Sequence, residues 1–107
     1  MAEVTIVLSA YRINDLEGKA PALPAEYHSV DVKTSSGSTQ PSSITAPNIP
    51  GAILVWEVTA SGGDVRVIFG DNPTATTTTG RRIVDGQTRE FTGRPGQKMA
   101  LINATAT

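Results

Sequence analysis

The sequence of 107 residues contains no cysteine and a single histidine. The missing cysteine excludes disulfide frameworks, thiolate catalysis and cysteine-ligated metal sites. No stretch approaches the ~20 consecutive apolar residues of a membrane-spanning helix, so we expect no membrane insertion. Residues 1–5 also lack the basic segment and the apolar core of a secretory signal peptide. We therefore expect the protein to be made in a cytoplasm.

Aromatic residues and net charge are also scarce. Only 5% of the residues are aromatic and 38% are hydrophobic, which predicts a lean core that would gain from apolar burial between copies of the chain. The formal net charge of −1 gives nucleic acid no electrostatic attraction, so we expect no nucleic-acid partner. The late arginines are offset by nearby acids; they are Arg81, Arg82, Arg89 and Arg94, against Asp71, Asp85 and Glu90.

Short strands and turn signals fill the second half of the chain. Apolar and polar residues alternate over residues 65–69, and further short runs follow at 82–84, 88–92 and 98–103. Asp85-Gly86 and Pro95-Gly96 are typical turn pairs, and Asp-Gly between apolar runs is a strong hairpin signal. Residues 61–64 predict one more tight hairpin, which would join residues 52–60 to residues 65–69.

The first half also contains alternating segments. Residues 4–8 predict a strand with Val4 and Ile6 on one face, and residues 26–33 predict another with His28, Val30 and Val32 sharing a face. Residues 11–19 are ambiguous between a helical turn and a loop. Residues 34–41 indicate a polar, flexible connection. Residues 52–60 have apolar side chains on both faces, which favours a central strand or one covered by another chain.

These elements together predict the fold class. Roughly seven to eight short strands with Gly and Pro punctuation, and no convincing helix, indicate an all-β protein, an antiparallel β-sandwich or jelly roll. We expect one domain over residues 1–107, with residues 1–25 as a candidate extended N-terminal arm. No sequence repeat at a fixed period supports a solenoid or propeller.

Candidate chemical groups do not form a recognisable constellation. His28 alternates in phase with Val30 and Val32, which favours a partly buried imidazole. No ligand spacing for a metal and no Gly-x-Ser-x-Gly elbow is present. The acids Asp64, Asp71 and Asp85 stand at turns, where Asp mainly bonds nearby backbone. We therefore expect no catalytic residue, no metal site, no cofactor and no enzymatic activity.

One segment and one aromatic residue are candidates for contact with other molecules. The threonine tract, residues 74–80, is predicted to be either an exposed extended arm or a strand covered by a neighbouring subunit. Trp56 alternates with Leu54 and Val58, which favours a core position over a sugar-stacking one. Tyr27 stands on the polar face of its strand and is the better candidate for an exposed ring that contacts a glycan.

Residues 52–104 resemble small virion proteins of tailed phages and phage-like particles. The resemblance is in Val65-Arg66-Val67-x-Phe69-Gly70-Asp71-Asn72-Pro73-Thr74-Ala75-Thr76, then Gly86, Glu90-Phe91, Pro95-Gly96-Gln97-Lys98 and Ala100-Leu101-Ile102. These proteins include capsid decoration proteins and the bases of head fibres or spikes. Residues 1–51 match no family that we can name.

The resemblance implies a β-rich, non-enzymatic subunit of the virion, made in the host cytoplasm. It would form a homo-oligomer, with a trimer favoured, and dock on the major capsid protein or another virion protein, stabilising the shell or anchoring a fibre. Sheet edges recruit partner strands, and residues 2–8 and 98–107 are the expected edges. The candidate contacts are Val4, Ile6, Thr76, Thr77, Thr78 and Arg81. The alternative is a carbohydrate-binding or host-receptor-recognition module that binds a cell-surface glycan.

Overall fold

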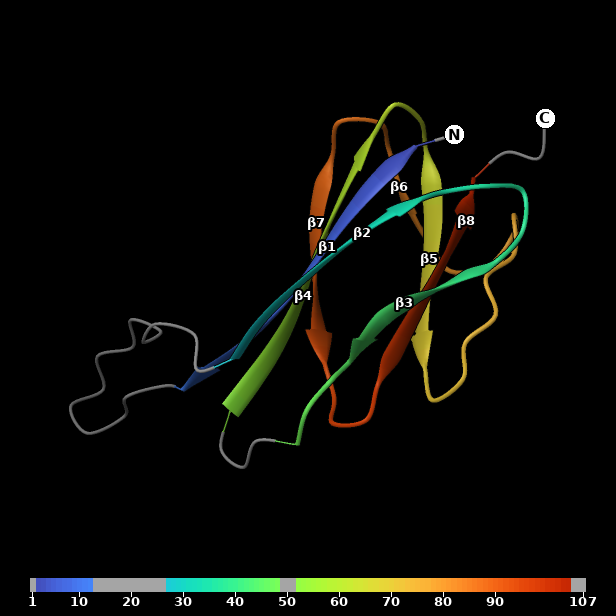
Figure 1. Cartoon of the computed structure of the whole chain (residues 1–107). Coiled ribbons are helices and arrows are strands. Elements are labelled where there is room, and N and C mark those ends of the chain that lie inside the picture. Colours follow the sequence, from blue (N-terminus) through green and yellow to red (C-terminus); the bar gives the residue numbers. More distant parts are fainter. Residues whose placement is uncertain (1, 13–26, 49–51, 105–107) are drawn as a thin grey trace.

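The computed structural model describes residues 2–12, 27–48 and 52–104, apart from the side chains of residues 11, 12, 27 and 28, and it contains strands and no helix over those ranges (Figure 1). The strands are β1 (Glu3–Arg12), β2 (Tyr27–Thr34), β3 (Gln40–Thr45), β4 (Ala52–Ser61), β5 (Val65–Gly70), β6 (Arg81–Ile83), β7 (Thr88–Gly93) and β8 (Lys98–Asn103). They form two antiparallel sheets. The first sheet has the order β2-β1-β4-β7, and the second sheet has the order β3-β8-β5-β6.

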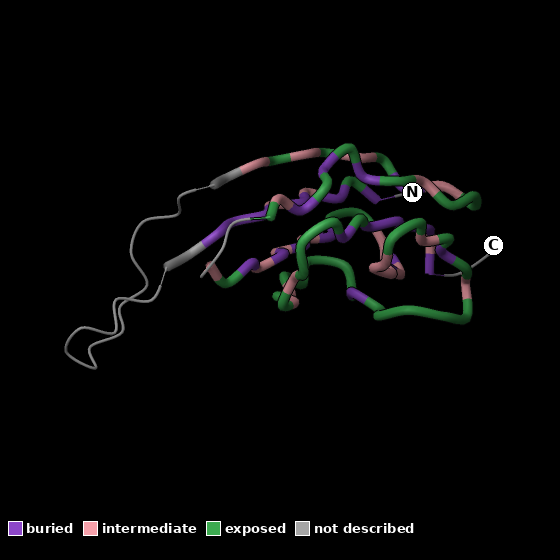
Figure 2. The backbone as a smooth tube through the Cα atoms, turned by 90° about the horizontal axis from the view of Figure 1, so that it is seen from below, coloured by how far each residue is buried: buried purple, intermediate pink, exposed green. Residues whose placement is uncertain are grey.

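The two sheets pack face to face as layers of a sandwich (Figure 2). Alternate residues of β1, β4, β5 and β8 point into the space between them, and the largest fully buried side chain is Trp56. Its ring packs against Phe69 at 5.5 Å between centroids, and Phe69 packs against Phe91 at 5.1 Å. The expected all-β antiparallel sandwich and the core position of Trp56 are both confirmed.

The strand of residues 4–8 is not an edge. β1 pairs along its length with β2 on one side and with β4 on the other. Val4 and Ile6 are fully buried between the sheets, so neither side chain is available to a partner. β8 likewise lies between β3 and β5. The expected edge strands at both ends of the chain were therefore wrong, because other strands of the same chain already occupy both sides of β1 and β8.

The expected N-terminal arm of residues 1–25 is only partly described. β1 places its first part inside a sheet, and residues 13–25 lie outside the described residues.

The turn signals were placed correctly, but the strands that flank them do not form hairpins. Gly62, Gly86 and Gly96 all adopt positive φ, as such turns require. β4 and β5 nevertheless lie in different sheets, as do β6 and β7, and β7 and β8. Each turn is therefore an arch between the two layers. The expected hairpins were wrong. β5 cannot pair with β4 because β1 and β7 occupy both edges of β4, and β6 pairs with β5 while β7 pairs with β4.

Two further expectations fail at β2 and β3. β3 forms within and beyond the segment expected to be a flexible connection, as an edge strand that tolerates Pro41 beside a register shift. Val30 and Val32 of β2 point out of the sandwich and are 54% and 53% exposed. Their face was expected to be buried. Asp31, on the opposite face, instead reaches β3, where its carboxylate accepts hydrogen bonds from the Ser43 N–H (2.9 Å) and the Ser42 hydroxyl (3.2 Å).

Candidate functional site

The outer face of the first sheet carries a strip of apolar side chains. Val7 of β1 lies directly opposite Val30 of β2, and cross-strand partners point to the same side of a sheet. Val32, one position further along that side of β2, is equally exposed. Val55 and Ile53 of β4 lie on the same outer face, where Val55 is opposite Ser9 of β1 and Glu57 is opposite Val7. We call these five apolar residues the valine strip. An apolar strip on the solvent side of an antiparallel sheet is typical of a surface that meets another protein.

Two glutamates border the valine strip. Glu57 of β4 and Glu90 of β7 are direct cross-strand partners on the same outer face. Like charges at such positions repel each other, because their Cβ atoms are only about 5 Å apart. Within the described residues, neither carboxylate takes part in an ion pair. This face is therefore apolar and acidic.

The outer face of the second sheet has the opposite charge. Arg66 of β5 and Arg82 of β6 are direct cross-strand partners on this face. Arg81 precedes Arg82 on the same exposed edge strand, but it stands opposite the buried Val67. Arg82 Nη2 pairs with Asp64 Oδ2 at 2.6 Å. Arg66 has no ion pair with a described residue; its Nη1 donates to the Gly80 carbonyl at 3.3 Å and its Nε has no partner. Each outer face thus has one like-charged cross-strand pair, acidic on one sheet and basic on the other.

The threonine tract folds back on the outer face of the second sheet. Ala75 is buried against Ile68, Ala100 and Ile102, and its N–H donates to Thr39 Oγ1 at 2.8 Å. Thr76 Oγ1 accepts the N–H of Thr79 at 3.1 Å, a local turn that threonine side chains favour. The tract is neither of the two expected forms, because it packs on its own chain and contains no strand.

The tract still leaves part of its surface open. Thr76, Thr78 and Arg81 are exposed, and Thr77 is half-buried. Their contact with a partner stays a prediction. Tyr27 begins β2, but its side chain lies outside the described residues, so its proposed glycan contact also stays a prediction.

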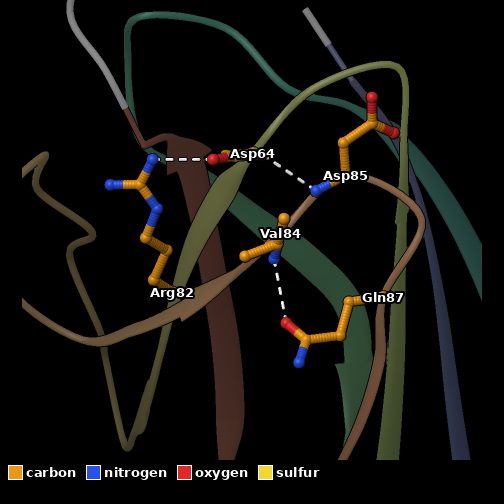
Figure 3. A network of polar contacts seen from close by, with 5 residues as sticks. All are labelled: Asp64, Arg82, Val84, Asp85 and Gln87. Atoms are coloured by element: carbon orange, nitrogen blue, oxygen red, sulfur yellow. Dashed lines mark hydrogen bonds and ion pairs between the residues drawn. The ribbon is translucent and has the colours of Figure 1, made fainter.

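A polar network joins two of the arches at one end of the sandwich (Figure 3). Asp64 Oδ1 accepts the N–H of Asp85 at 2.8 Å, and Asp85 Oδ1 accepts the N–H of Gly62 at 2.8 Å. Gln87 Oε1 accepts the N–H of Val84 at 3.0 Å. The hydrogen bond from Arg82, followed by that from Asp85, lowers the pKa of Asp64. Asp64 and Asp85 thus bond turn backbone, as their positions in the sequence indicate.

A pocket of about 350 Å³ opens at the other end of the sandwich, where β5 ends and the turn between β7 and β8 lies. It is lined by Asp71, Arg94, Pro95 and Gln97. The sequence predicts the Pro95-Gly96 turn but not the pocket. No local signal identifies it, because Asp71 and Arg94 are 23 positions apart in the sequence.

Neither a metal cluster nor a membrane-crossing helix is found in the described ranges. No group of three or more His, Asp or Glu side chains there is placed to hold a metal ion. Likewise, none of the described segments forms a helix long and apolar enough to cross a membrane. Comparisons with protein-family models, with curated proteins and with solved structures find no match to this chain.

Proposed function

We propose that the protein is a non-enzymatic structural subunit that assembles with copies of itself on the surface of a phage or phage-like capsid. There it stabilises the shell or anchors a fibre or spike. The resemblance of residues 52–104 to small virion proteins suggests the class. The observation that carries the proposal is the exposed valine strip on the first sheet, since Val30 and Val32 remain more than half exposed in the single chain.

A second copy of the chain is the partner that the charges favour. The valine strip is bordered by the Glu57–Glu90 pair, whereas the opposite outer face carries the Arg66–Arg82 pair. Contact between the first sheet of one copy and the second sheet of the next would bring these pairs together and relieve both repulsions. Such a contact joins two different surfaces, so it repeats from copy to copy and closes into a ring when the rotation allows. A trimer is the ring we favour.

The assembly is tested by placing a charge in the valine strip. Val30→Lys is expected to convert the oligomer to a monomer, measured as molar mass by light scattering during size-exclusion chromatography. Val84→Lys is the matched control, because Val84 is 49% exposed but lies in the arch between β6 and β7, away from the strip. A wild-type chain that stays monomeric at high concentration would rule out this assembly.

Attachment to the particle needs its own experiment. Purified wild-type protein is mixed with particles that lack it, and co-sedimentation is measured. We expect saturable binding, and we expect Val30→Lys to reduce it strongly while Val84→Lys does not. Failure of the oligomeric wild-type protein to bind such particles would contradict the virion role while leaving self-assembly intact.

A further inference from the structure

The pocket at the turn between β7 and β8 contains the side-chain amide of Gln97, which is held in place from one side only. Gln97 is 8% exposed, and its Oε1 accepts hydrogen bonds from Trp56 Nε1 (2.8 Å) and from the Arg94 N–H (3.2 Å). Because the indole N–H can only donate, the amide oxygen must face it, and the Nε2 group takes the other side. The Nε2 group of Gln97 therefore has two N–H donors that bond no described residue. Gln97 is one of the residues that line the pocket.

The backbone around Gln97 is also fixed. The Gln97 carbonyl accepts the N–H of Ala46 at 2.8 Å, and the Ala46 carbonyl accepts the N–H of Gly96 at 2.9 Å. The Gln97 N–H donates to the Arg94 carbonyl at 3.1 Å, which closes the turn between β7 and β8. The free amide is therefore already oriented before any ligand arrives, which lowers the entropy cost of binding.

Two groups of opposite charge complete the pocket. The Asp71 carboxylate and the Arg94 guanidinium both line it, and neither side chain forms a hydrogen bond or ion pair with the described residues. The pocket thus offers a strong acceptor, a planar set of donors and the amide donors of Gln97, beside the apolar ring of Pro95. Its volume lies at the lower end of the usual range for small-molecule sites, about 300–1,000 Å³.

We propose that this pocket binds a saccharide through two or more neighbouring hydroxyl groups. A hydroxyl both donates and accepts, so adjacent sugar hydroxyls can donate to Asp71 while accepting from Arg94 and Gln97. The opposite charges cancel, which favours a ligand without net charge. An anionic ligand is opposed by Asp71, and a cationic ligand is opposed by Arg94.

The site does not depend on the assembly proposed above. That assembly uses the outer faces of the two sheets, whereas the residues that line the pocket follow β5 and β7 in the chain. These two strands finish at the same end of the sandwich (Figure 1). The end therefore stays accessible in a ring built through the sheet faces. On a particle surface, such a site would contact glycans of the cell.

The first experiment is titration of ¹⁵N-labelled full-length protein with the methyl glycosides of glucose, galactose, mannose and N-acetylglucosamine. We expect at least one glycoside to shift the Gln97 side-chain amide, the Trp56 indole N–H and the Arg94 amide signals in a saturable way. Glycine is titrated in parallel, because a zwitterion also matches the charges. The absence of saturable shifts with all four glycosides, or equal binding of glycine, would overturn the proposal.

Variants then test the named groups. Asp71→Asn and Arg94→Gln are each expected to weaken binding of the same glycoside roughly tenfold or more, since each loses a charged hydrogen-bonding group. Gln97→Glu keeps an acceptor for Trp56 and removes the Nε2 donors, and we expect a similar loss. The controls Asp85→Asn and Arg81→Gln lie outside the pocket and should bind as the wild type does. Equal affinity of Asp71→Asn, Arg94→Gln and wild type would rule out this pocket, and tryptophan fluorescence checks that each variant is folded.

Discussion

At the residue scale, the position of a side chain rather than its type decides its role. Gln87 and Gln97 both accept backbone hydrogen bonds in turns. Gln87 is exposed, whereas Gln97 is buried and also accepts the indole N–H of Trp56. A buried N–H donor that loses its hydrogen-bond partner lowers the free energy of unfolding by about 1–3 kcal/mol, whereas an exposed donor forms a hydrogen bond with water instead. Replacing Gln97 therefore costs more stability than replacing Gln87, unless the new side chain keeps an acceptor for the indole N–H.

Gly80 provides the sharpest test of a single position. It has φ of 89°, and a Cβ atom built there would lie 2.3 Å from the carbonyl oxygen of Val67. We expect Gly80→Ala to lower the free energy of unfolding by about 1–3 kcal/mol, because the alanine must adopt a strained backbone and displace β5. Urea-induced unfolding followed by tryptophan fluorescence measures the change.

Gly37→Ala is the matched control for Gly80. No atom lies within 4 Å of a Cβ at Gly37, and its φ is not positive. We expect its stability to stay within about 0.5 kcal/mol of wild type. Equal unfolding midpoints for the two variants would show that the end of the threonine tract is not held against β5 as described.

At the element scale, the strands were predictable but their neighbours were not. Alternation in residues 4–8, 52–60 and 65–69 reports which residues share a face, and β1, β4 and β5 cover those segments. It does not report which strand lies alongside. A turn pair such as Asp85-Gly86 requires a tight change of direction, which a hairpin and an arch both satisfy. Packing between the layers decided that these turns became arches.

The inner and outer faces of the first sheet are distinguished by truncating one side chain on each face. We expect Ile6→Ala to lower the unfolding free energy by about 2–5 kcal/mol, because Ile6 is fully buried in the core. Val30→Ala is expected to cost less than about 0.5 kcal/mol, since Val30 is exposed on the outer face. Both values come from urea unfolding at a protein concentration where the chain is monomeric. A larger loss for Val30→Ala than for Ile6→Ala would show that the outer face of the sheet, and not the inner face, is buried.

Asp31 and Asp64 each accept a backbone hydrogen bond from another element, and their pKa values indicate how the stability of the fold changes in acid. Partial burial acts to raise the pKa of Asp31, but the hydrogen bonds from Ser43 and Ser42 and the charge of Lys33 outweigh it, so the pKa falls below the ordinary value of 3.8. The pKa of Asp64 is also lowered. Protons therefore bind the unfolded chain first as the pH falls, and these contributions to stability are complete above about pH 4 and are lost below it.

The acid prediction is checked with the double variant D31N/D64N. We expect it to be less stable than wild type at pH 6 and to lose less stability between pH 6 and pH 3, as measured by urea unfolding. Asp71→Asn serves as the control, because that carboxylate forms no hydrogen bond with described residues, and its loss should match that of wild type. A wild-type stability that is unchanged at pH 3 would contradict both assignments.

At the scale of the whole molecule, the two outer faces differ in charge although the chain is nearly neutral. The formal net charge is −1, yet the Glu57–Glu90 pair and the Arg66–Arg82 pair lie on opposite sides of the sandwich. A net charge gives no hint of such a separation. The separation favours contact between unlike faces of two copies and disfavours contact between like faces.

Exchange of the charges tests this arrangement. We expect E57K/E90K and R66E each to be monomeric alone, and their equimolar mixture to associate, because an altered face of one then matches an altered face of the other. The second variant leaves the Arg82–Asp64 pair intact. Sedimentation velocity measures the mixture and the separate variants. We also expect wild-type association to weaken between 50 mM and 500 mM salt, and association that is insensitive to both changes would exclude a charge-guided contact.

The sequence by itself determined the all-β class, most strand positions, the positive-φ turns and the core position of Trp56. These properties follow from local alternation and turn chemistry, which act over a few residues. Only the tertiary structure decided that β1 is central, that Val30 and Val32 face outward, and that Asp71, Arg94 and Gln97 meet in one pocket. Those outcomes depend on which strands pair and which side of each sheet finds the other layer. Both are set by burial of the whole core, so no single segment contains the information.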